Sequence, residues 1–282
     1  MARVLTVHGI NNTYSARPVM ASEWVPALLG GVELAGGRGR LSEADVACVF
    51  YGDLFRRPGR VLGDEDVETL EADDVEDGAE AELLAAWWQE AASTDPSVVT
   101  PGAPTLGVMS GVQAALAALS GSRFLAGASE RLLIFWLKQV RAYFTQPGIR
   151  EQIQQRFADT VTADIEVVVA HSLGTVVAYE ALNAHPEWGV KNLVTLGSPL
   201  GIRNVILDRL IPPAQRPASV TAWANIADRA DFVALVKRLE PVFGPPLTDI
   251  EISNGATFHS VARYLTARDT GAAVAAAVRP GG

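Results

Sequence analysis

The chain has 282 residues, of which 49% are hydrophobic, and its formal net charge is -9. This length fits one α/β domain with an insertion as well as it fits two domains. The negative charge argues against nucleic acid or an anionic membrane surface as the main partner. We find no signal peptide and no apolar run suited to crossing a bilayer, and we therefore expect a soluble, cytoplasmic protein without stable membrane insertion.

Six short apolar runs predict β-strands. They show little alternation of apolar and polar residues, which is typical of strands covered on both faces. The runs span residues 3–7, 46–51, 165–170, 192–196, 220–226 and, more weakly, 249–252. Helical patterns lie between most of them, at 21–34, 174–184, 203–210 and 258–267. This order predicts an α/β fold with a mainly parallel sheet of about six strands flanked by helices.

The regular order breaks down in residues 53–128, which we interpret as an insertion within one domain spanning residues 1–282. Residues 64–82 are crowded with Asp and Glu, and we expect them to form a solvated face or a loop. A helix of small apolar residues is predicted over 106–126, and a second long helix, with an apolar stripe, over 130–144. The insertion is either a packed decoration or a lid over an apolar site.

Cys48 is the single cysteine, so the chain cannot form an internal disulfide. It lies in the apolar run VACVFY, and we interpret it as a buried core residue rather than a catalytic thiol. The acidic residues show no metal-ligand spacing, and the sequence contains no phosphate-binding loop. We therefore expect the protein to need neither a metal nor a cofactor.

The stretch AHSLG, residues 170–174, joins an apolar run to a helical pattern. It follows the pattern G-x-S-x-G, with Ala170, the smallest possible replacement, in the first position. Glycines are needed there because the turn is so tight that the neighbours of the serine nearly touch the strand and the helix. Ser172 would lie at the tip of this turn, at a helix N-terminus that favours negative charge. The alternative is a serine that merely caps the helix.

Together with three other features, this turn resembles the α/β-hydrolase fold, and in particular its lipases and esterases. AHSLG looks like the nucleophile elbow, and VHGI at 7–10 looks like the H-G loop that gives one oxyanion amide. LGSPLG at 196–201 is similar to the G-S-P stretch of many lipases. The order Ser, Asp, His is also that of the fold. The resemblance covers about residues 3–52 and 130–268, and it lacks the antiparallel strand pair that often opens this fold.

The resemblance implies a histidine base, and the chain has four histidines. His8 belongs to the H-G loop and comes too early in the chain. His171 is adjacent to the serine and is expected to point away, while His185 ends a predicted helix and is expected on the surface or at a helix C-terminus. His259 follows the last predicted strand and opens a helix, which is where this fold places its base.

The acid that orients the base should follow the fifth predicted strand, in WANIADRADFVAL. Both Asp228 and Asp231 qualify. Asp231 is favoured because the acid of this fold commonly lies several residues past the strand and is followed by apolar residues, here Phe232 and Val233. A buried carboxylate there would fix the tautomer of the histidine and stabilise the imidazolium.

The expected mechanism is attack by Ser172 on an acyl carbonyl, with His259 taking the proton. The backbone amides of Leu173 and Ile10 would hold the oxyanion, and water would then hydrolyse the acyl-enzyme. The implied partner is a small-molecule acyl substrate whose chain a lid could cover, using residues Leu106, Val108, Met109, Val112, Leu116 and Leu119.

The leading hypothesis is therefore a serine hydrolase that cleaves a carboxylic ester of an apolar or lipid-like acyl substrate. A thioesterase, an amidase, or an acyltransferase or cyclase would use the same acyl-enzyme. A non-catalytic binding protein on the same fold is the alternative outside enzymology, and the presence of all three candidate residues argues against it.

Overall fold

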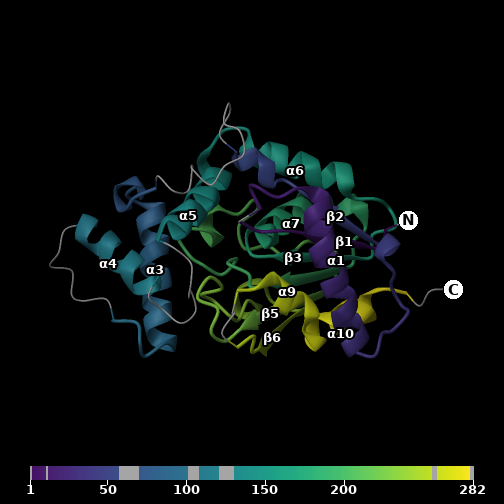
Figure 1. The fold of residues 1–282 in the computed structure, drawn as a ribbon. Helices are drawn as coiled ribbons and strands as arrows, with labels where there is room; N and C mark the ends of the chain where they lie inside the picture. The colour runs from purple at the N-terminus through teal and green to yellow at the C-terminus, as the bar shows by residue number, and fades with distance from the viewer. Residues whose placement is uncertain are drawn as a thin grey trace. The chain divides into compact units, whose positions relative to one another are not determined.

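The computed structural model describes residues 2–10, 12–56, 70–100, 108–120, 130–255 and 259–279, without the side chains of residues 94 and 108–110 (Figure 1). The chain forms two compact units. The first unit consists of Met1–Leu54 and Arg150–Gly282, and the second unit of Phe55–Ile149. The segment that interrupts the strand pattern is thus a compact body of helices with its own internal contacts.

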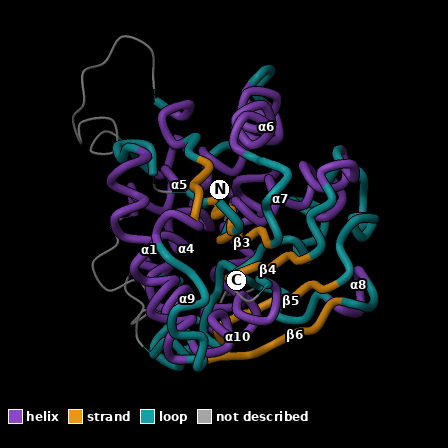
Figure 2. Tube along the Cα trace, turned by 90° about the vertical axis from the view of Figure 1, so that its right-hand side faces the viewer, coloured by secondary structure: helices purple, strands orange, loops and turns teal. Residues whose placement is uncertain are grey.

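The first unit contains a six-stranded sheet in which every pair of neighbouring strands is parallel. Its order is β2-β1-β3-β4-β5-β6, and Figure 2 shows β3 to β6 side by side in that order. The strands are β1 (Val4–Val7), β2 (Val46–Val49), β3 (Val167–His171), β4 (Asn192–Leu196), β5 (Ala222–Asp228) and β6 (Leu247–Ile252). All six coincide with predicted strands to within two residues at each end, which confirms the α/β class and the parallel sheet.

The central strands are mostly apolar because helices cover both faces of the sheet. Val167 and Val169 of β3 belong to a core cluster that also contains buried residues from α1 (Arg17–Leu34), α9 (Val261–Thr266) and α10 (Arg268–Ala277). Side chains alternate along a strand, so Val168 and Ala170 face the opposite side. On that side α7 (Leu173–Ala184) contacts β3 and β1, and α6 (Ile149–Thr160) is joined to α7 by a hydrogen bond from Gln154 Nε2 to the carbonyl of Val177. The short helix α8 (Glu240–Phe243) packs on β6.

The predicted helix at 203–210 is wrong. Only Leu207–Arg209 is helical there, as one 3₁₀ turn. Asn204 has a positive φ of 62°, which an α-helix does not allow, and its amide donates to the carboxylate of Asp208. Of the other predicted helices, 21–34 and 174–184 are confirmed. The helix predicted over 258–267 is shorter than expected, because α9 covers only Val261–Thr266, and Phe258 lies outside the described residues.

In the described residues of the second unit, three helices pack on one another: α3 (Ala79–Thr94), α4 (Val108–Ser120) and α5 (Glu130–Thr145). The helices predicted over 106–126 and 130–144 correspond to α4 and α5, and residues 106–107 and 121–126 lie outside the described residues. Helix α3 was not predicted, because its first turn belongs to the acidic run 64–82.

One residue of that run corrects the expectation of a solvated face. Glu80 is buried, with a side-chain exposure of 1%, and its Oε2 lies 2.9 Å from Lys138 Nζ on α5. Arg141 lies near the other carboxylate oxygen, at 3.8 Å. A carboxylate with two basic neighbours and a hydrogen bond from the Glu76 amide can be buried, and here it joins α3 to α5. The part of the run before residue 70 lies outside the described residues.

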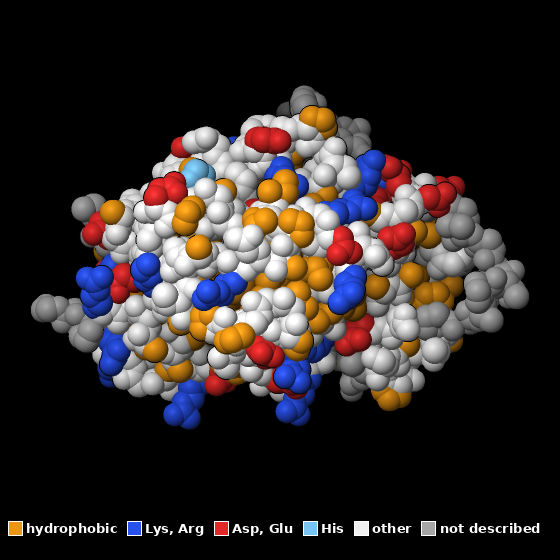
Figure 3. Space-filling view, turned by 180° about the vertical axis from the view of Figure 1, so that it is seen from behind, with side chains coloured by type: hydrophobic (Ala, Val, Ile, Leu, Met, Phe, Trp, Pro, Cys, Tyr) orange, Lys and Arg blue, Asp and Glu red, His pale blue; other side chains and the backbone are white. Residues whose placement is uncertain are grey.

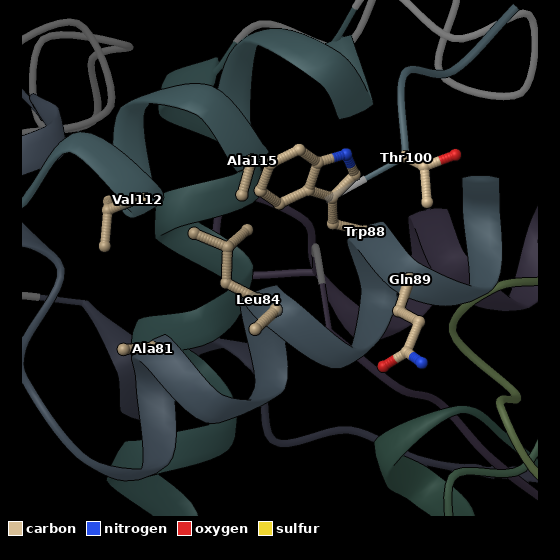
Figure 4. A pocket seen from close by; sticks show the side chains of 9 residues that line it. Ala81, Leu84, Trp88, Gln89, Thr100, Val112 and Ala115 are labelled. Atoms are coloured by element: carbon tan, nitrogen blue, oxygen red, sulfur yellow. The ribbon is translucent and has the colours of Figure 1, made fainter. Parts of the chain in front are cut away.

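An apolar cleft of about 440 Å³ lies between α3 and α4 within the second unit (Figure 4). Leu84, Trp88 and Gln89 line it from α3, and Val112 and Ala115 from α4, and Thr100 also lines it. The Trp88 indole nitrogen donates to the carbonyl of Val99 at 2.7 Å, which fixes the ring at the wall of the cleft.

Of the residues proposed to cover an acyl chain, Val112, Leu116 and Leu119 are buried in the packing of the second unit. Leu106 lies outside the described residues, as do the side chains of Val108 and Met109. Cys48 is buried in the first unit, as predicted.

Within the described part of the chain, no helix combines the length and the apolar character needed to cross a membrane. Basic and acidic side chains are interspersed on the face drawn in Figure 3, with apolar side chains between them. The large apolar residues that are most exposed come from separate parts of the chain: Tyr14, Val19, Leu34, Val99 and Ile211.

Candidate functional site

Ser172 occupies a strained turn between β3 and α7. The strand ends at His171, the helix begins at Leu173, and Ser172 lies between them with φ 53° and ψ -129°. A non-glycine residue in such a conformation costs about 1–3 kcal/mol and persists only where its surroundings enforce it. Ser172 stands at the N-cap position, yet its side chain makes no capping hydrogen bond. The interpretation of Ser172 as a simple helix cap therefore has no support in the geometry.

Backbone hydrogen bonds hold this turn in place. The Ser172 amide donates to the carbonyl of Leu196 at the end of β4, at 3.0 Å. The Ser172 carbonyl accepts from the amide and the hydroxyl of Thr175, at 2.9 and 2.7 Å. The Thr175 hydroxyl also lies 2.8 Å from the hydroxyl of Ser198. The serine is thereby anchored to the sheet on one side and to its own helix on the other.

Two glycines allow the loop after β1 to approach the serine closely. A Cβ on Gly9 would lie 2.5 Å from Ser172 Cβ and 3.1 Å from Ser172 Oγ. A Cβ on Gly174 would lie 2.5 Å from the carbonyl oxygen of Val7 and closer still to that of His8. Neither position can carry a side chain without moving the backbone. The H-G stretch and the serine turn, predicted separately from the sequence, are thus in direct contact.

The loop after β1 is itself fixed by His8. This ring is fully buried, and its Nε2 accepts a hydrogen bond from the Tyr51 amide at 3.0 Å, so Nδ1 carries the proton. Nδ1 in turn donates to the Gly9 carbonyl at 2.6 Å, and the Tyr51 hydroxyl donates to the His8 carbonyl. Burial lowers the pKa of His8 to about 4, so the ring is neutral near pH 7. Ile10 follows Gly9 in this loop.

Asp231 and His259 form a hydrogen-bonded pair. His259 Nδ1 lies 2.7 Å from Asp231 Oδ2. The carboxylate is fully buried, and its Oδ1 accepts the amides of Val233 and Ala234 at 3.0 and 3.3 Å. Burial alone would raise the pKa of Asp231, but the charge of His259 and hydrogen bonds from His259 and Tyr264 bring it below its ordinary value. Asp231 is therefore ionised near neutral pH.

Asp228, the alternative acid, has different partners. It is the last residue of β5, and its carboxylate accepts the amide of Ala230 at 2.7 Å and that of Asn254. These bonds close the turn that leads to Asp231 and join it to the loop after β6. Burial raises the pKa of Asp228. The structure thus brings Asp231, and not Asp228, to His259.

Gly197 makes room for this pair at the end of β4. It has φ 53°, and a Cβ there would lie 2.8 Å from Asp231 Oδ2 and 3.2 Å from His259 Cε1. Gly197 directly follows Leu196, whose carbonyl accepts the Ser172 amide. The LGSPLG stretch therefore contacts the serine turn with one residue and the Asp231–His259 pair with the next.

His171 makes a contact that was not predicted from the sequence. Its ring packs on His259 with the ring centroids 4.6 Å apart, and it lies 5.7 Å from Tyr264. Burial, and then the charge of His259, lower the pKa of His171 well below its ordinary value, so the ring is neutral. His185 agrees with its prediction, because it ends α7 near the surface and pairs with Glu187 at 2.8 Å.

Two residues of this region were not identified from the sequence. Tyr264 and Tyr51 looked like ordinary members of apolar runs, and no local pattern separates them from core aromatics. Their roles arise from contacts with residues 33 and 43 positions away along the chain.

In the described part of the chain, no group of three or more His, Cys, Asp or Glu side chains could hold a metal ion. A strained serine and a histidine hydrogen-bonded to a buried carboxylate are instead the groups that nucleophilic catalysis requires. Comparison with protein-family models, with curated proteins and with solved structures gives no significant match.

Proposed function

We propose that the protein is a serine hydrolase of the α/β-hydrolase fold that cleaves a carboxylic ester of an apolar or lipid-like acyl substrate. The observation that carries the proposal is the backbone of Ser172, held at φ 53° between a central strand and a helix. Strain of this kind, at a residue whose hydroxyl makes no capping bond, favours a functional role over a structural one. In the same unit, the partly buried His259 and the buried Asp231 supply the partners that a serine nucleophile needs.

In the proposed reaction, Ser172 Oγ attacks the acyl carbon while His259 Nε2 takes its proton. Asp231 accepts the hydrogen bond of Nδ1, which leaves Nε2 as the basic nitrogen, and it stabilises the imidazolium that forms. The imidazolium then protonates the leaving alcohol. In the second half of the reaction His259 activates a water molecule, which attacks the acyl-enzyme and releases the acid.

The proposed oxyanion donors are the backbone amides of Leu173 and Ile10. Leu173 is the first residue of α7, and the first amides of a helix have no partner within it. Ile10 belongs to the loop that Gly9 brings against Ser172 and that His8 holds rigid. Rigid donors matter because the loss of one such amide costs about 3–4 kcal/mol of transition-state stabilisation.

The test is covalent labelling with a fluorophosphonate probe, followed by mass spectrometry to locate the label. We expect labelling at Ser172, and loss of both labelling and ester hydrolysis in Ser172→Ala. Ser22→Ala, which removes a hydroxyl bonded to its own helix in α1, is the control and should behave as the wild type. Hydrolysis that survives in Ser172→Ala would refute the assignment of the nucleophile.

A panel of nitrophenyl esters of increasing chain length, with matched thioesters and amides, then defines the substrate class. We expect esters with apolar chains to give the highest kcat/KM. A clear preference for thioesters or amides would keep the acyl-enzyme mechanism and replace the ester as the substrate.

A further inference from the structure

The hydroxyl of Tyr264 lies at the centre of the buried acid. It donates to Asp231 Oδ2 at 2.7 Å and accepts the Asp228 amide at 2.8 Å. The direction of the first bond is certain because a backbone amide can only donate, so the single proton of the hydroxyl is left for Asp231. His259 Nδ1 also lies 2.7 Å from Asp231 Oδ2. One carboxylate oxygen therefore serves both the tyrosine and the histidine.

We propose that Tyr264 is a positioning residue of the reaction, whose hydroxyl shares Asp231 Oδ2 with His259 and thereby sets the basicity of that histidine. The inference rests on the proposed function, in which His259 is the general base. It goes beyond that function because it assigns the strength of the base to a residue outside the proposed Ser172–His259–Asp231 triad.

The physical reason is competition for negative charge. A donor on Oδ2 reduces the electron density that this oxygen offers to the imidazolium, so the charged form of His259 is held less strongly. Burial, and then the charge of Asp231, raise the pKa of Tyr264 well above its ordinary value, so the hydroxyl keeps its proton throughout the working range. Removal of the hydroxyl should leave Oδ2 to His259 alone and make His259 a stronger base.

Other charged or titratable groups also face the pair. His171 packs on His259 from the end of β3, and its buried ring is neutral. The carboxylate of Asp228 binds two backbone amides beside Asp231, and Lys237 Nζ donates to the Asp231 carbonyl. None of these contacts is made to Asp231 Oδ2, the oxygen that accepts the hydrogen bond of His259. Tyr264, in contrast, donates to that oxygen.

The chain offers a matched control for the loss of a buried tyrosine hydroxyl. Tyr179 on α7 is also fully buried, donates to the Pro212 carbonyl at 2.7 Å and accepts the Gln215 amide at 2.8 Å. Tyr179→Phe and Tyr264→Phe each remove one hydrogen bond that the hydroxyl donates and one that it accepts from a backbone amide, and both keep the ring. They differ in whether the hydroxyl contacts Asp231.

The first measurement is the pH profile of kcat/KM on a short-chain ester, together with thermal unfolding of each variant. In Tyr264→Phe we expect the pKa of the acid limb to rise by on the order of half to one pH unit. Tyr179→Phe should keep the wild-type pKa even where its unfolding temperature falls equally. An unchanged profile in Tyr264→Phe, or the same shift in both variants, would show that Tyr264 only fills the core.

The second measurement does not need catalysis. His259 is titrated by NMR in a Ser172→Ala background, with its signals assigned by comparison with His259→Gln. Tyr264→Phe should raise this pKa, and replacement of Tyr264 by 3-fluorotyrosine, a stronger donor of nearly the same size, should lower it. If these opposite shifts are seen but the protein with Ser172 intact hydrolyses no ester, the coupling is upheld and the proposed function is rejected. If that protein hydrolyses esters but the shifts are absent, the proposed function is upheld and the role of Tyr264 is rejected.

Discussion

Gly197→Ala tests whether the end of β4 positions the Asp231–His259 pair. The substitution has two separate costs. Gly197 has φ 53°, and a side chain in the left-handed region costs about 1–2 kcal/mol of stability. The new Cβ would also lie 2.8 Å from Asp231 Oδ2, whereas ordinary contacts begin at 3.4 Å, so the carboxylate or the loop must move by about 0.6 Å.

The carboxylate cannot yield without consequence, because Oδ2 is held by both His259 and Tyr264. A misplacement of about 1 Å at a reacting group can cost about 100-fold in rate. For the smaller shift required here we expect kcat/KM to fall by about 10-fold or more, which corresponds to about 1.4 kcal/mol or more in the barrier.

Gly189→Ala separates the two costs. Gly189 also has a positive φ, of 70°, but a Cβ there would meet no atom within 4 Å. Urea unfolding should show the backbone cost of about 1–2 kcal/mol in Gly189→Ala and at least that loss in Gly197→Ala. Only Gly197→Ala should slow ester hydrolysis and the labelling of Ser172 by a fluorophosphonate. Equal rates in the two variants would refute the argument that Gly197 makes room for the pair.

Three further predictions follow from the same geometry. Asp231→Asn should lower kcat by up to about 10⁴-fold because an amide favours the wrong histidine tautomer, whereas Asp228→Asn should mainly lower stability. If Asp228→Asn lowered kcat more than Asp231→Asn, Asp228 would be the acid. His8 takes up a proton below about pH 6.5 in the unfolded chain but only below about pH 4 in the folded protein, so the free energy of unfolding should fall by about 3 kcal/mol as the pH drops from 6.5 to 4. Urea unfolding over this pH range checks it, because His8→Gln should lose about 3 kcal/mol less than the wild type. Gly111→Leu should fill the apolar cleft of the second unit, since a Cβ at Gly111 meets no atom within 4 Å, and should weaken binding of an apolar fluorescent probe. An accompanying change in acyl-length preference would assign the cleft to the substrate. A charged substitution of the buried Leu116 is not a usable test, because it would only unfold the unit.

The sheet could be predicted from the sequence because its central strands are buried on both faces and are therefore mostly apolar, with few polar positions. The helices were harder wherever their burial depends on few residues. Helix α6 buries only Ile153 and Phe157, which gives almost no apolar stripe. Helix α10 packs through Gly271 directly against Gly31 of α1, and a contact made by the absence of side chains leaves no hydrophobic signal.

The candidate site divides in the same way. The turn at Ser172 has a local signature, because its tightness restricts the neighbouring residue types. Asp231 and His259 are predicted from the order Ser, Asp, His along the chain, which is the order of the fold that the sequence resembles. His171 and Tyr264 have neither kind of signal. Whether their rings meet His259 and Asp231 depends on how β3 and α9 are positioned, and residue type alone does not specify this.

The position of Ser172 also has a reason in the strand order. From β1 the chain moves to β2 on one side, and it later returns to β3 on the other side of β1. In open parallel sheets, a crevice forms beyond the carboxyl ends of the strands at such a reversal, because the two connections leave in opposite directions. Gly9 follows β1, Ser172 follows β3, and the two residues meet at this point. Gly197 and Asp231 follow β4 and β5, the next strands in the sheet, so successive loops can bring their side chains to the same edge. The proposed nucleophile thus lies at the reversal, and this topology allows the neighbouring strand ends to supply its proposed acid and base.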